Sequence, residues 1–313
     1  MEKDTIDKCT IYKVIHGSQA YGTSTPNSDL DIRGICVPDK KYFLGFNTKF
    51  DQFELKAEEI VIYSIRKYFE LATACNPNVI ELIFIDDPEL VQLETPWSAR
   101  IKMHRDLFLS MKAKHTFSGY AYAQLKRIQT HKKWLLEPPD HKPTRSEFGL
   151  NENDVISFSQ LGALNKVVEN GGVLETSAME IVRKENAYRN AAMHYNQYEE
   201  WKHERNPKRA ALEAKFGYDT KHAMHLVRLL RMGLEILEKG KVIVKRPDAE
   251  ELLDIRNGAW SFDKIVGYAA EMDTRMQVMY DSGKCAVPHS ADKEKLNDVC
   301  IDIIEHYWNN SLW

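Results

Sequence analysis

Residues 16–34 read HGSQAYGTSTPNSDLDIRG, and they carry the strongest chemical signal in the chain. They follow the apolar run 11–15, which is typical of a buried strand. A Gly-Ser pair at 17–18 predicts a turn, and a spacer rich in Gly, Ser, Thr, Pro and Asn follows it. Asp29 and Asp31 then open a second apolar run. The order of strand, turn, spacer and paired aspartates predicts a polar site at one end of a small sheet.

The two aspartates suggest a metal site. On a strand, residues i and i+2 point to the same face, so Asp29 and Asp31 would project together. Two carboxylates this close repel each other unless cations lie between them. Mg²⁺ takes oxygen ligands, commonly carboxylates with substrate phosphates, and the backbone N–H groups of Gly17 and Ser18 could hold those phosphates. The pattern favours metal-dependent nucleotidyl transfer, although an Asp-x-Asp pair and a Gly-Ser turn each occur in ordinary solvated loops.

The arrangement resembles the signature of the DNA polymerase β-type nucleotidyltransferase superfamily: Gly-Ser, a spacer, two acidic residues, and a third acidic residue on a later strand. Within that superfamily it is similar to the RNA-repair-pathway polymerase-β-like branch, which includes many phage-encoded proteins. The matching residues are Gly17, Ser18, Tyr21, Gly22, Ser28, Asp29, Asp31, Arg33 and Gly34. The resemblance implies that the two aspartates are catalytic metal ligands, and that the nucleotide is bound by Gly17, Ser18, Tyr21, Ser28 and Arg33.

The resemblance also implies a third carboxylate, on a strand expected at 59–63. Glu59 matches the acidic position before the family's Tyr-Ser pair, and it would lie at the start of that strand. Glu58 is the competing residue, adjacent in sequence but on the opposite face of a strand. The residues alone are equally consistent with a solvated glutamate at a strand end.

The composition is that of an ordinary soluble protein. The 313 residues, 43% hydrophobic and 28% charged, are enough for about two domains. A net charge of −3 gives no global attraction to nucleic acid, so such binding would need a local patch. Five cysteines without a Cys-x-x-Cys pair argue against a zinc ribbon or a disulfide scaffold. Since no segment reads as a signal peptide or a membrane span, a cytoplasmic protein without a membrane partner is expected.

The rest of the chain reads as mostly helical. Residues 39–56 form an excursion without clear periodicity, and a helix is expected at 65–75. Asn76, followed by a proline, predicts the start of a further helix. The sequence YSIRKYFELATACNPNVIEL, which contains both, also follows the family. A proline-rich loop at 137–143 breaks the helical pattern, and 242–244 reads as a short strand.

A later helix carries a basic stripe. Lys221, His225 and Arg228 fall at i, i+4 and i+7 and therefore share one face, while leucines supply the buried side. A basic surface stripe without a binding role is the alternative. The segment TKHAMHLVRLLRMG matches a second motif of the family, which implies that these three residues contact nucleotide phosphates.

We therefore expect an α+β fold: a small mixed β-sheet nucleotidyltransferase core with flanking helices, followed by a mostly helical C-terminal half. Residues 1–136 would form the catalytic domain and residues 137–313 a helical nucleotide- and acceptor-binding domain. Asp29, Asp31 and Glu59 would hold two Mg²⁺ ions, for which Mn²⁺ could substitute. The expected reaction transfers NMP from an NTP such as ATP to an RNA or tRNA 3′ end and releases pyrophosphate. The alternatives are nucleotidylation of a protein or small molecule, and a non-catalytic nucleotide- or RNA-binding module.

Overall fold

The computed structural model describes residues 1–172 and 175–310. The chain forms two compact units, one joining Met1–Ile128 with Thr220–Trp313 and the other comprising Gln129–Asp219. The sequence of the second unit is thus inserted between the two segments of the first. The assignment of catalysis to residues 1–136 and of nucleotide and acceptor binding to residues 137–313 stays a prediction.

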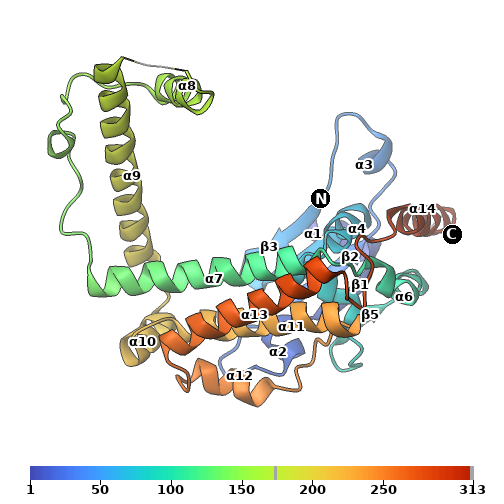
Figure 1. Ribbon diagram of the computed structural model, residues 1–313. Coiled ribbons are helices and arrows are strands. Elements are labelled where there is room, and N and C mark those ends of the chain that lie inside the picture. The colour runs from blue at the N-terminus through green and yellow to red at the C-terminus, as the bar shows by residue number, and fades with distance from the viewer. Residues whose placement is uncertain (173–174, 311–313) are drawn as a thin grey trace. The chain divides into compact units, whose positions relative to one another are not determined.

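The first unit contains a five-stranded mixed sheet in the order β3-β4-β2-β1-β5 (Figure 1). Strands β2 and β4 are parallel, whereas the other neighbouring pairs are antiparallel. The expected α+β fold with a small mixed sheet is confirmed. The strands are β1 (Thr10–Ile15), β2 (Ile32–Cys36), β3 (Gln52–Leu55), β4 (Ile60–Ser64) and β5 (Val91–Glu94).

A glycine allows the central strands of the sheet to lie close together. A Cβ atom at Gly34 of β2 would lie 2.4 Å from the carbonyl oxygen of Tyr12 and 2.8 Å from a methyl carbon of Ile62. Tyr12 is fully buried and donates its hydroxyl to the carbonyl oxygen of Leu82, at 3.1 Å. The glycine that matches the family motif is therefore required by packing in the middle of the sheet.

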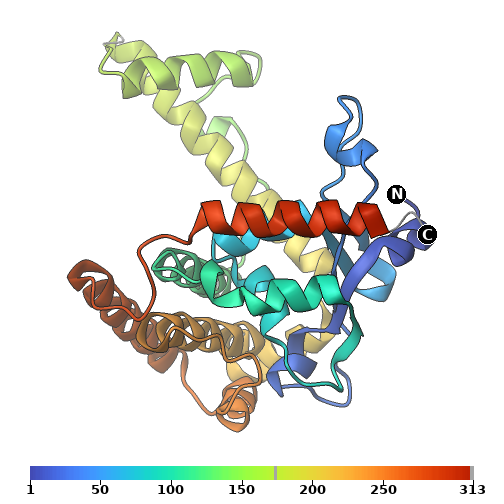
Figure 2. The ribbon, with the colours of Figure 1, turned by 90° about the vertical axis from the view of Figure 1, so that its right-hand side faces the viewer.

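Helices cover the sheet and extend the first unit. Figure 2 shows α14 running alongside α4 and α6. Asn76 caps α5 by accepting the backbone N–H of Asn78, so the helix start expected there is confirmed. Ser64 caps α4 in the same way, by accepting the backbone N–H of Lys67. The helices of this unit are α1 (Lys3–Cys9), α2 (Gly17–Tyr21), α3 (Lys41–Leu44), α4 (Ile65–Thr73), α5 (Pro77–Ile80), α6 (Pro96–Met103), α11 (Thr220–Lys239), α12 (Ala249–Arg256), α13 (Phe262–Ser282) and α14 (Lys293–Asn310), with the 3₁₀ turns η1 (Lys56–Glu58), η2 (Glu81–Phe84) and η3 (Arg105–Phe108). Helix α7 (Ala113–Leu136) begins in this unit and ends in the other.

Helix α11 is the most deeply buried helix of the C-terminal half, and it packs against α12 and α13. Its apolar residues Leu226, Leu230 and Leu237 are fully buried. A Cβ atom at Gly233 would lie 2.8 Å from the Cβ of Phe117 in α7, so the two helices touch at a residue without a side chain. The expected helix and its buried side are confirmed.

The second unit is a helical assembly with a thin core. Helix α9 has 29 residues, and those classed as buried are Val182, Glu185 and Tyr198. Glu185 is fully buried and paired with Arg145 and Arg189. The elements of this unit are η4 (Ser146–Phe148), α8 (Phe158–Glu169), α9 (Thr176–Glu204) and α10 (Pro207–Phe216).

Three local expectations need correction. The strand expected at 242–244 is wrong: Val242 and Val244 are buried, but the carbonyl of Ile243 accepts from the Arg246 side chain, at 3.2 Å, instead of from a strand. The segment read as an irregular excursion contains β3, and β5 was not expected. Both are short edge strands of four residues, too short for a clear alternation of apolar side chains.

Among the described residues, no helix is long and apolar enough to cross a membrane.

Candidate active site

The Gly-Ser pair begins the five-residue helix α2, which directly follows β1. Gly17 has a φ of +65°, in the left-handed region that favours glycine. A Cβ atom there would lie 2.1 Å from Oδ2 of Asp31, so only a glycine leaves room for this carboxylate. The backbone N–H of His16 donates to the carbonyl oxygen of Asp31, at 2.8 Å. The fold thus brings the Gly-Ser pair and the second aspartate into direct contact.

The two aspartates lie in the segment immediately before β2, which begins at Ile32. Asp29 is exposed, and the side chain of Asp31 is 30% exposed. Nη2 of Arg33 lies 3.3 Å from Oδ1 of Asp31 and orients that carboxylate. Ser28 stabilises the turn that leads into the pair, because its hydroxyl accepts the backbone N–H of Thr25 at 2.9 Å.

Glu59 is the backbone neighbour of Asp31. In the parallel ladder Ile32 lies opposite Ile60, so Asp31 and Glu59 occupy the positions just before the paired residues. The carbonyl oxygen of Glu59 accepts the backbone N–H of Ile32 at 3.0 Å and Nη1 of Arg33 at 2.7 Å. The Glu59 side chain is exposed.

The competing Glu58 has another partner: its carboxylate lies 2.6 Å from Nζ of Lys3. Asp29, Asp31 and Glu59 belong to the segments just before the parallel strands β2 and β4, and their side-chain oxygens do not all come within 4.8 Å of one another, as far as the described residues go. The choice of Glu59 as the third carboxylate stays a prediction, and its backbone position beside Asp31 favours it.

Helix α11 does not present its three basic residues as one exposed stripe. Lys221 and His225 are half-buried, but Arg228 is only 5% exposed. Nη1 of Arg228 donates to Oε1 of Glu81 at 2.9 Å, and its guanidinium lies 3.8 Å from the centre of the Tyr21 ring. The burial arises because α11 is packed by neighbours on most of its faces. Tyr21, expected to bind the nucleotide, is buried with Arg228 and donates its hydroxyl to Glu81.

Glu81 and His16 were not singled out from the sequence as site residues. Glu81 is fully buried, and Nε2 of His16 lies 3.3 Å from its Oε2. The available signal was an acidic residue inside the apolar run VIELIF, where a charge needs a buried partner. The partner, Arg228, is 147 positions away in the chain, which no local pattern reveals.

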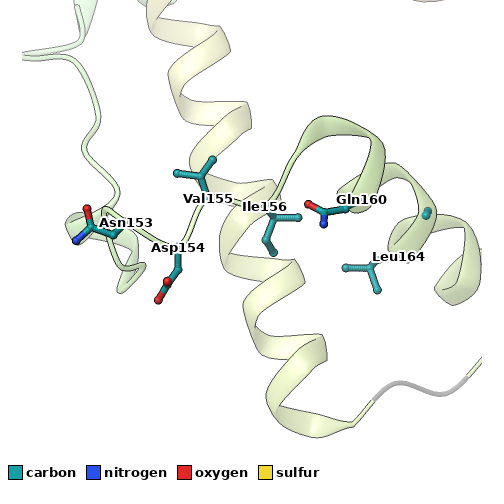
Figure 3. Close-up of a pocket in the computed structure, with 7 residues that line it drawn as sticks. Asn153, Asp154, Val155, Ile156, Gln160 and Leu164 are labelled. Carbon is teal, nitrogen blue, oxygen red and sulfur yellow. The ribbon is translucent and has the colours of Figure 1, made fainter.

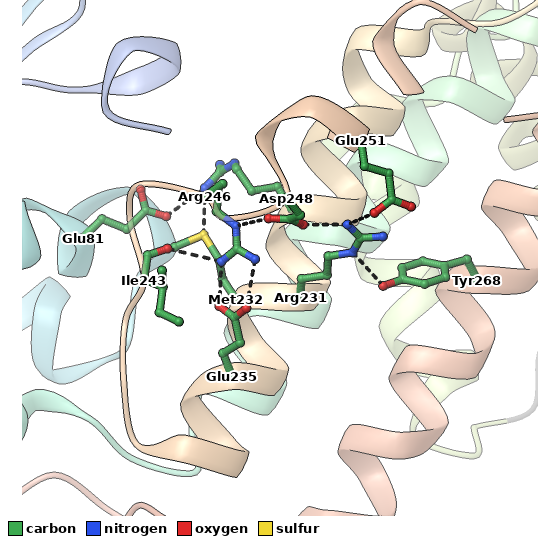
Figure 4. A network of polar contacts seen from close by, with 10 residues as sticks. Glu81, Arg231, Met232, Glu235, Ile243, Arg246, Asp248, Glu251 and Tyr268 are labelled. Atoms are coloured by element: carbon green, nitrogen blue, oxygen red, sulfur yellow. Dashed lines mark hydrogen bonds and ion pairs between the residues drawn. The ribbon is translucent and has the colours of Figure 1, made fainter. Parts of the chain in front are cut away.

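A second network of hydrogen bonds and ion pairs connects the segment after α11 to that helix (Figure 4). The guanidinium of Arg246 donates to Glu235 and Asp248, and Arg231 donates to Asp248, Glu251 and Tyr268. Burial lowers the pKa of Arg246, but its hydrogen bonds to Glu235 and Asp248 raise it overall. The backbone N–H of Arg246 donates to the carbonyl oxygen of Tyr21 at 3.1 Å, so this network also holds the end of α2.

The second unit contains a shallow pocket of its own, about 720 Å³ in volume (Figure 3). It is formed within one local segment, and none of its lining residues was predicted as a site residue. The lining residues are Asn153, Asp154, Val155, Ile156, Gln160, Ala163 and Leu164.

Comparison with known proteins gives a match in the part of the chain that contains this site. A related protein, described as an uncharacterized 38.9 kDa protein in the nrdC-mobD intergenic region of Enterobacteria phage T4, is 28% identical over 127 residues. The match covers 37% of this chain and 37% of the phage protein, so the chain spans well under half of its relative. No solved structure matches significantly. Residues 3–137 match the RNA repair pathway DNA polymerase beta family. In this segment the chain is similar to that family.

Proposed function

We propose that this protein is a metal-dependent nucleotidyltransferase that transfers NMP from an NTP to an acceptor hydroxyl at an RNA end, tRNA 3′ ends included, and releases pyrophosphate. The observation that carries the proposal is the contact between Gly17 and the Asp31 carboxylate, with Glu59 beside it on the parallel strand. The start of α2, which would bind the phosphates, and the segments that carry Asp31 and Glu59 then meet at one end of the parallel strands. The match of residues 3–137 to the polymerase-β-like family supports the same reaction class.

The donor set fits a hard divalent cation. Asp29, Asp31 and Glu59 supply carboxylate oxygens, which Mg²⁺ prefers, and all three side chains are at least partly accessible. These residues would hold two Mg²⁺ ions, or Mn²⁺ in their place. When bound, the ions would lower the pKa of the acceptor hydroxyl and neutralise charge on the triphosphate.

The chain's own groups would bind and orient the nucleotide. The backbone N–H groups of Gly17 and Ser18, with the Ser18 hydroxyl, would hold the β- and γ-phosphates. Arg33 would keep the Asp31 carboxylate oriented, because one guanidinium contacts both this carboxylate and the Glu59 backbone. Lys221 and His225, half-buried at the start of α11, would add positive charge to stabilise the transition state.

The test is incorporation of each α-³²P-labelled NTP into total tRNA with Mg²⁺. Wild type should label RNA, and Asp29→Ala/Asp31→Ala should reduce labelling by about 10³-fold or more, since the metal ligands are lost. Label on a purified protein or small molecule instead of RNA would identify a different acceptor. Salt-sensitive RNA binding that survives Asp31→Ala, without any transfer, would favour a non-catalytic module.

Two adjacent glutamates provide a matched comparison for the third carboxylate. Glu59→Gln should reduce labelling by about 10²-fold or more, because a neutral amide is a poor ligand for Mg²⁺. Glu58→Gln breaks only the exposed pair with Lys3 and should label RNA as wild type does. The opposite order of the two variants would reassign the third ligand to Glu58.

A further inference from the structure

Glu81 occupies an unusual position for a carboxylate. It lies at the start of η2 with no exposed surface, at one end of the network drawn in Figure 4. Three side chains from distant parts of the chain converge on it. The Tyr21 hydroxyl donates to Oε2 at 2.6 Å, and Nη1 of Arg228 donates to Oε1 at 2.9 Å. Nε2 of His16 lies 3.3 Å from Oε2. A buried carboxylate is costly unless it is paired and hydrogen-bonded, and this one is.

Two of these partners mark the two ends of α2. His16 is the residue before the helix, and Tyr21 is its last residue, so Glu81 contacts both ends of the element that carries Gly17 and Ser18. The Asp31 carboxylate lies against Gly17, the first residue of the same helix. Glu81 thus contacts the two residues that flank the start and end of α2, and Asp31 contacts Gly17 within it.

The third partner anchors the arrangement to the C-terminal half. Arg228 belongs to α11, outside the segment that matches the family, and its guanidinium covers the Tyr21 ring. Met232, one turn further along α11, places its sulfur 3.2 Å from Nη1 of Arg228. Because α11 is deeply buried against α12 and α13, it provides a rigid support for this ion pair.

We propose that Glu81 is a positioning residue: it fixes α2 through His16 and Tyr21, with Arg228 as its anchor, and so holds the Gly17–Ser18 turn in place for the triphosphate. The inference rests on the proposed function for the role of the turn. It assigns Tyr21 and Arg228 to the support of the nucleotide site instead of direct phosphate contact. It also gives a residue of α11, far away in sequence, a role in a site formed within the first 60 residues.

The test compares three variants, Glu81→Gln, Tyr21→Phe and Glu185→Gln. Tyr21→Phe removes a single hydroxyl and keeps the ring beneath Arg228, so it remains informative if Glu81→Gln folds poorly. Glu185→Gln is the matched control, because Glu185 is also fully buried and paired with arginines, but in the second unit. All three variants are made in the 313-residue chain and are measured at temperatures well below their melting temperatures.

Two readouts separate positioning from general destabilisation. The first is amide hydrogen exchange at His16, Gly22 and Thr23, whose N–H groups make the hydrogen bonds around α2. The second is binding of α,β-methylene nucleoside triphosphates with Mg²⁺, by calorimetry. Glu81→Gln and Tyr21→Phe should speed exchange at these amides and weaken binding about tenfold. In the labelling assay, KM for the NTP should rise about tenfold while kcat changes less than about threefold.

Glu185→Gln should leave both the exchange at α2 and the nucleotide affinity as in wild type. Unchanged exchange around α2 in Glu81→Gln and Tyr21→Phe would overturn the inference, whatever happens to nucleotide binding. An equal loss of affinity in Glu185→Gln would also overturn it, by showing a global effect. If wild type binds none of the analogues, the proposed function fails, and the exchange measurement alone still decides whether Glu81 holds α2.

Discussion

Gly17 meets two separate constraints, and they differ in physical origin. Its φ of +65° is a backbone conformation that costs residues with a side chain about 1–2 kcal/mol. Its Cα also faces Oδ2 of Asp31 so closely that a Cβ atom would lie 2.1 Å away. The first constraint concerns the turn, whereas the second links the turn to a proposed metal ligand.

Comparison with Gly283 separates the two constraints. Gly283, which ends α13, has a φ of +66°, and a Cβ atom added there would have no neighbouring atom within 4 Å. Gly283→Ala should therefore lower the free energy of unfolding by about 1 kcal/mol and leave nucleotide binding intact. Gly17→Ala should cost more than this and abolish labelling of RNA, because Asp31 is displaced. Urea unfolding and the labelling assay measure both effects, and equal behaviour of the two variants would contradict the contact with Asp31.

The Glu81 carboxyl predicts a pH dependence of stability with a definite sign. Burial raises its pKa, but the Arg228 charge and the hydrogen bonds from His16 and Tyr21 lower it below the ordinary value of 4.5. A lowered pKa in the folded state stabilises the protein above about pH 4.5, and this contribution is lost as the pH falls through the folded-state value.

Glu81→Gln should therefore lower the free energy of unfolding by about 3–5 kcal/mol at pH 7, because Arg228 is left as a buried unpaired charge. The difference from wild type should narrow as the pH is lowered below about 4.5 and falls through the folded-state pKa of the Glu81 carboxyl, where wild type takes up a proton. Urea unfolding at these pH values tests the prediction. A difference that is constant over the whole range would show that the charge of Glu81 has no part in it.

At the scale of elements, α11 links the sheet to the helical half of the chain. It supplies Arg228 to the support of α2, and it meets α7 at Gly233. Its residues differ in burial: Lys221 and His225 are half-buried, whereas Met232, Gly233 and Leu234 are buried. The helix therefore serves both as a core element and as a source of charged groups for the proposed site.

Two glycines inside helices test this packing. In an exposed helix, Gly→Ala stabilises by up to about 1 kcal/mol, since alanine has the higher helix propensity. Gly267→Ala in α13 should follow this rule, because no atom lies within 4 Å of the added Cβ. Gly233→Ala should instead destabilise by about 1–3 kcal/mol, because the new Cβ would lie 2.8 Å from the Cβ of Phe117. Thermal unfolding of the two variants gives the signs, and a stabilised Gly233→Ala would rule out close contact between α11 and α7.

At the scale of the whole molecule, the chain is divided between two compact units whose hydrophobic cores differ in size. The first unit contains the sheet and α11 with their many buried apolar residues, whereas α9 of the second unit has three buried residues among 29. Stability follows the amount of buried apolar surface, so the two units should open at different free energies.

Native-state hydrogen exchange in increasing denaturant should show this difference directly. The amides of β1 and α11 should share one high free energy of opening, since both belong to the first unit. The amides of α9 should exchange through a separate opening of lower free energy. Protection of α9 equal to that of α11 would mean that the chain unfolds as a single cooperative unit.

The sequence by itself determined the parts of this protein that depend on neighbouring residues. The order of strand, Gly-Ser pair, spacer and paired aspartates carried the family resemblance, which in turn implied the small mixed sheet. This motif could be recognised because backbone turns, helix caps and apolar periodicity are local. It also placed Asn76 at a helix start. Short edge strands such as β3 escaped prediction, because four residues give too little pattern.

Tertiary structure alone decided which residues surround the site and which support it. Arg228 reads as part of a basic stripe in sequence, yet the fold buries it against Glu81 and Tyr21. Asp31 reads in sequence as a strand residue that shares a face with Asp29, yet it lies just before β2 and its carboxylate fills the space beside Gly17. These contacts join residues from separate parts of the chain. A charged side chain can be buried at low cost only where an oppositely charged partner is buried beside it. No local pattern can specify such a partner, because the pairing arises only when the sheet and α11 pack together.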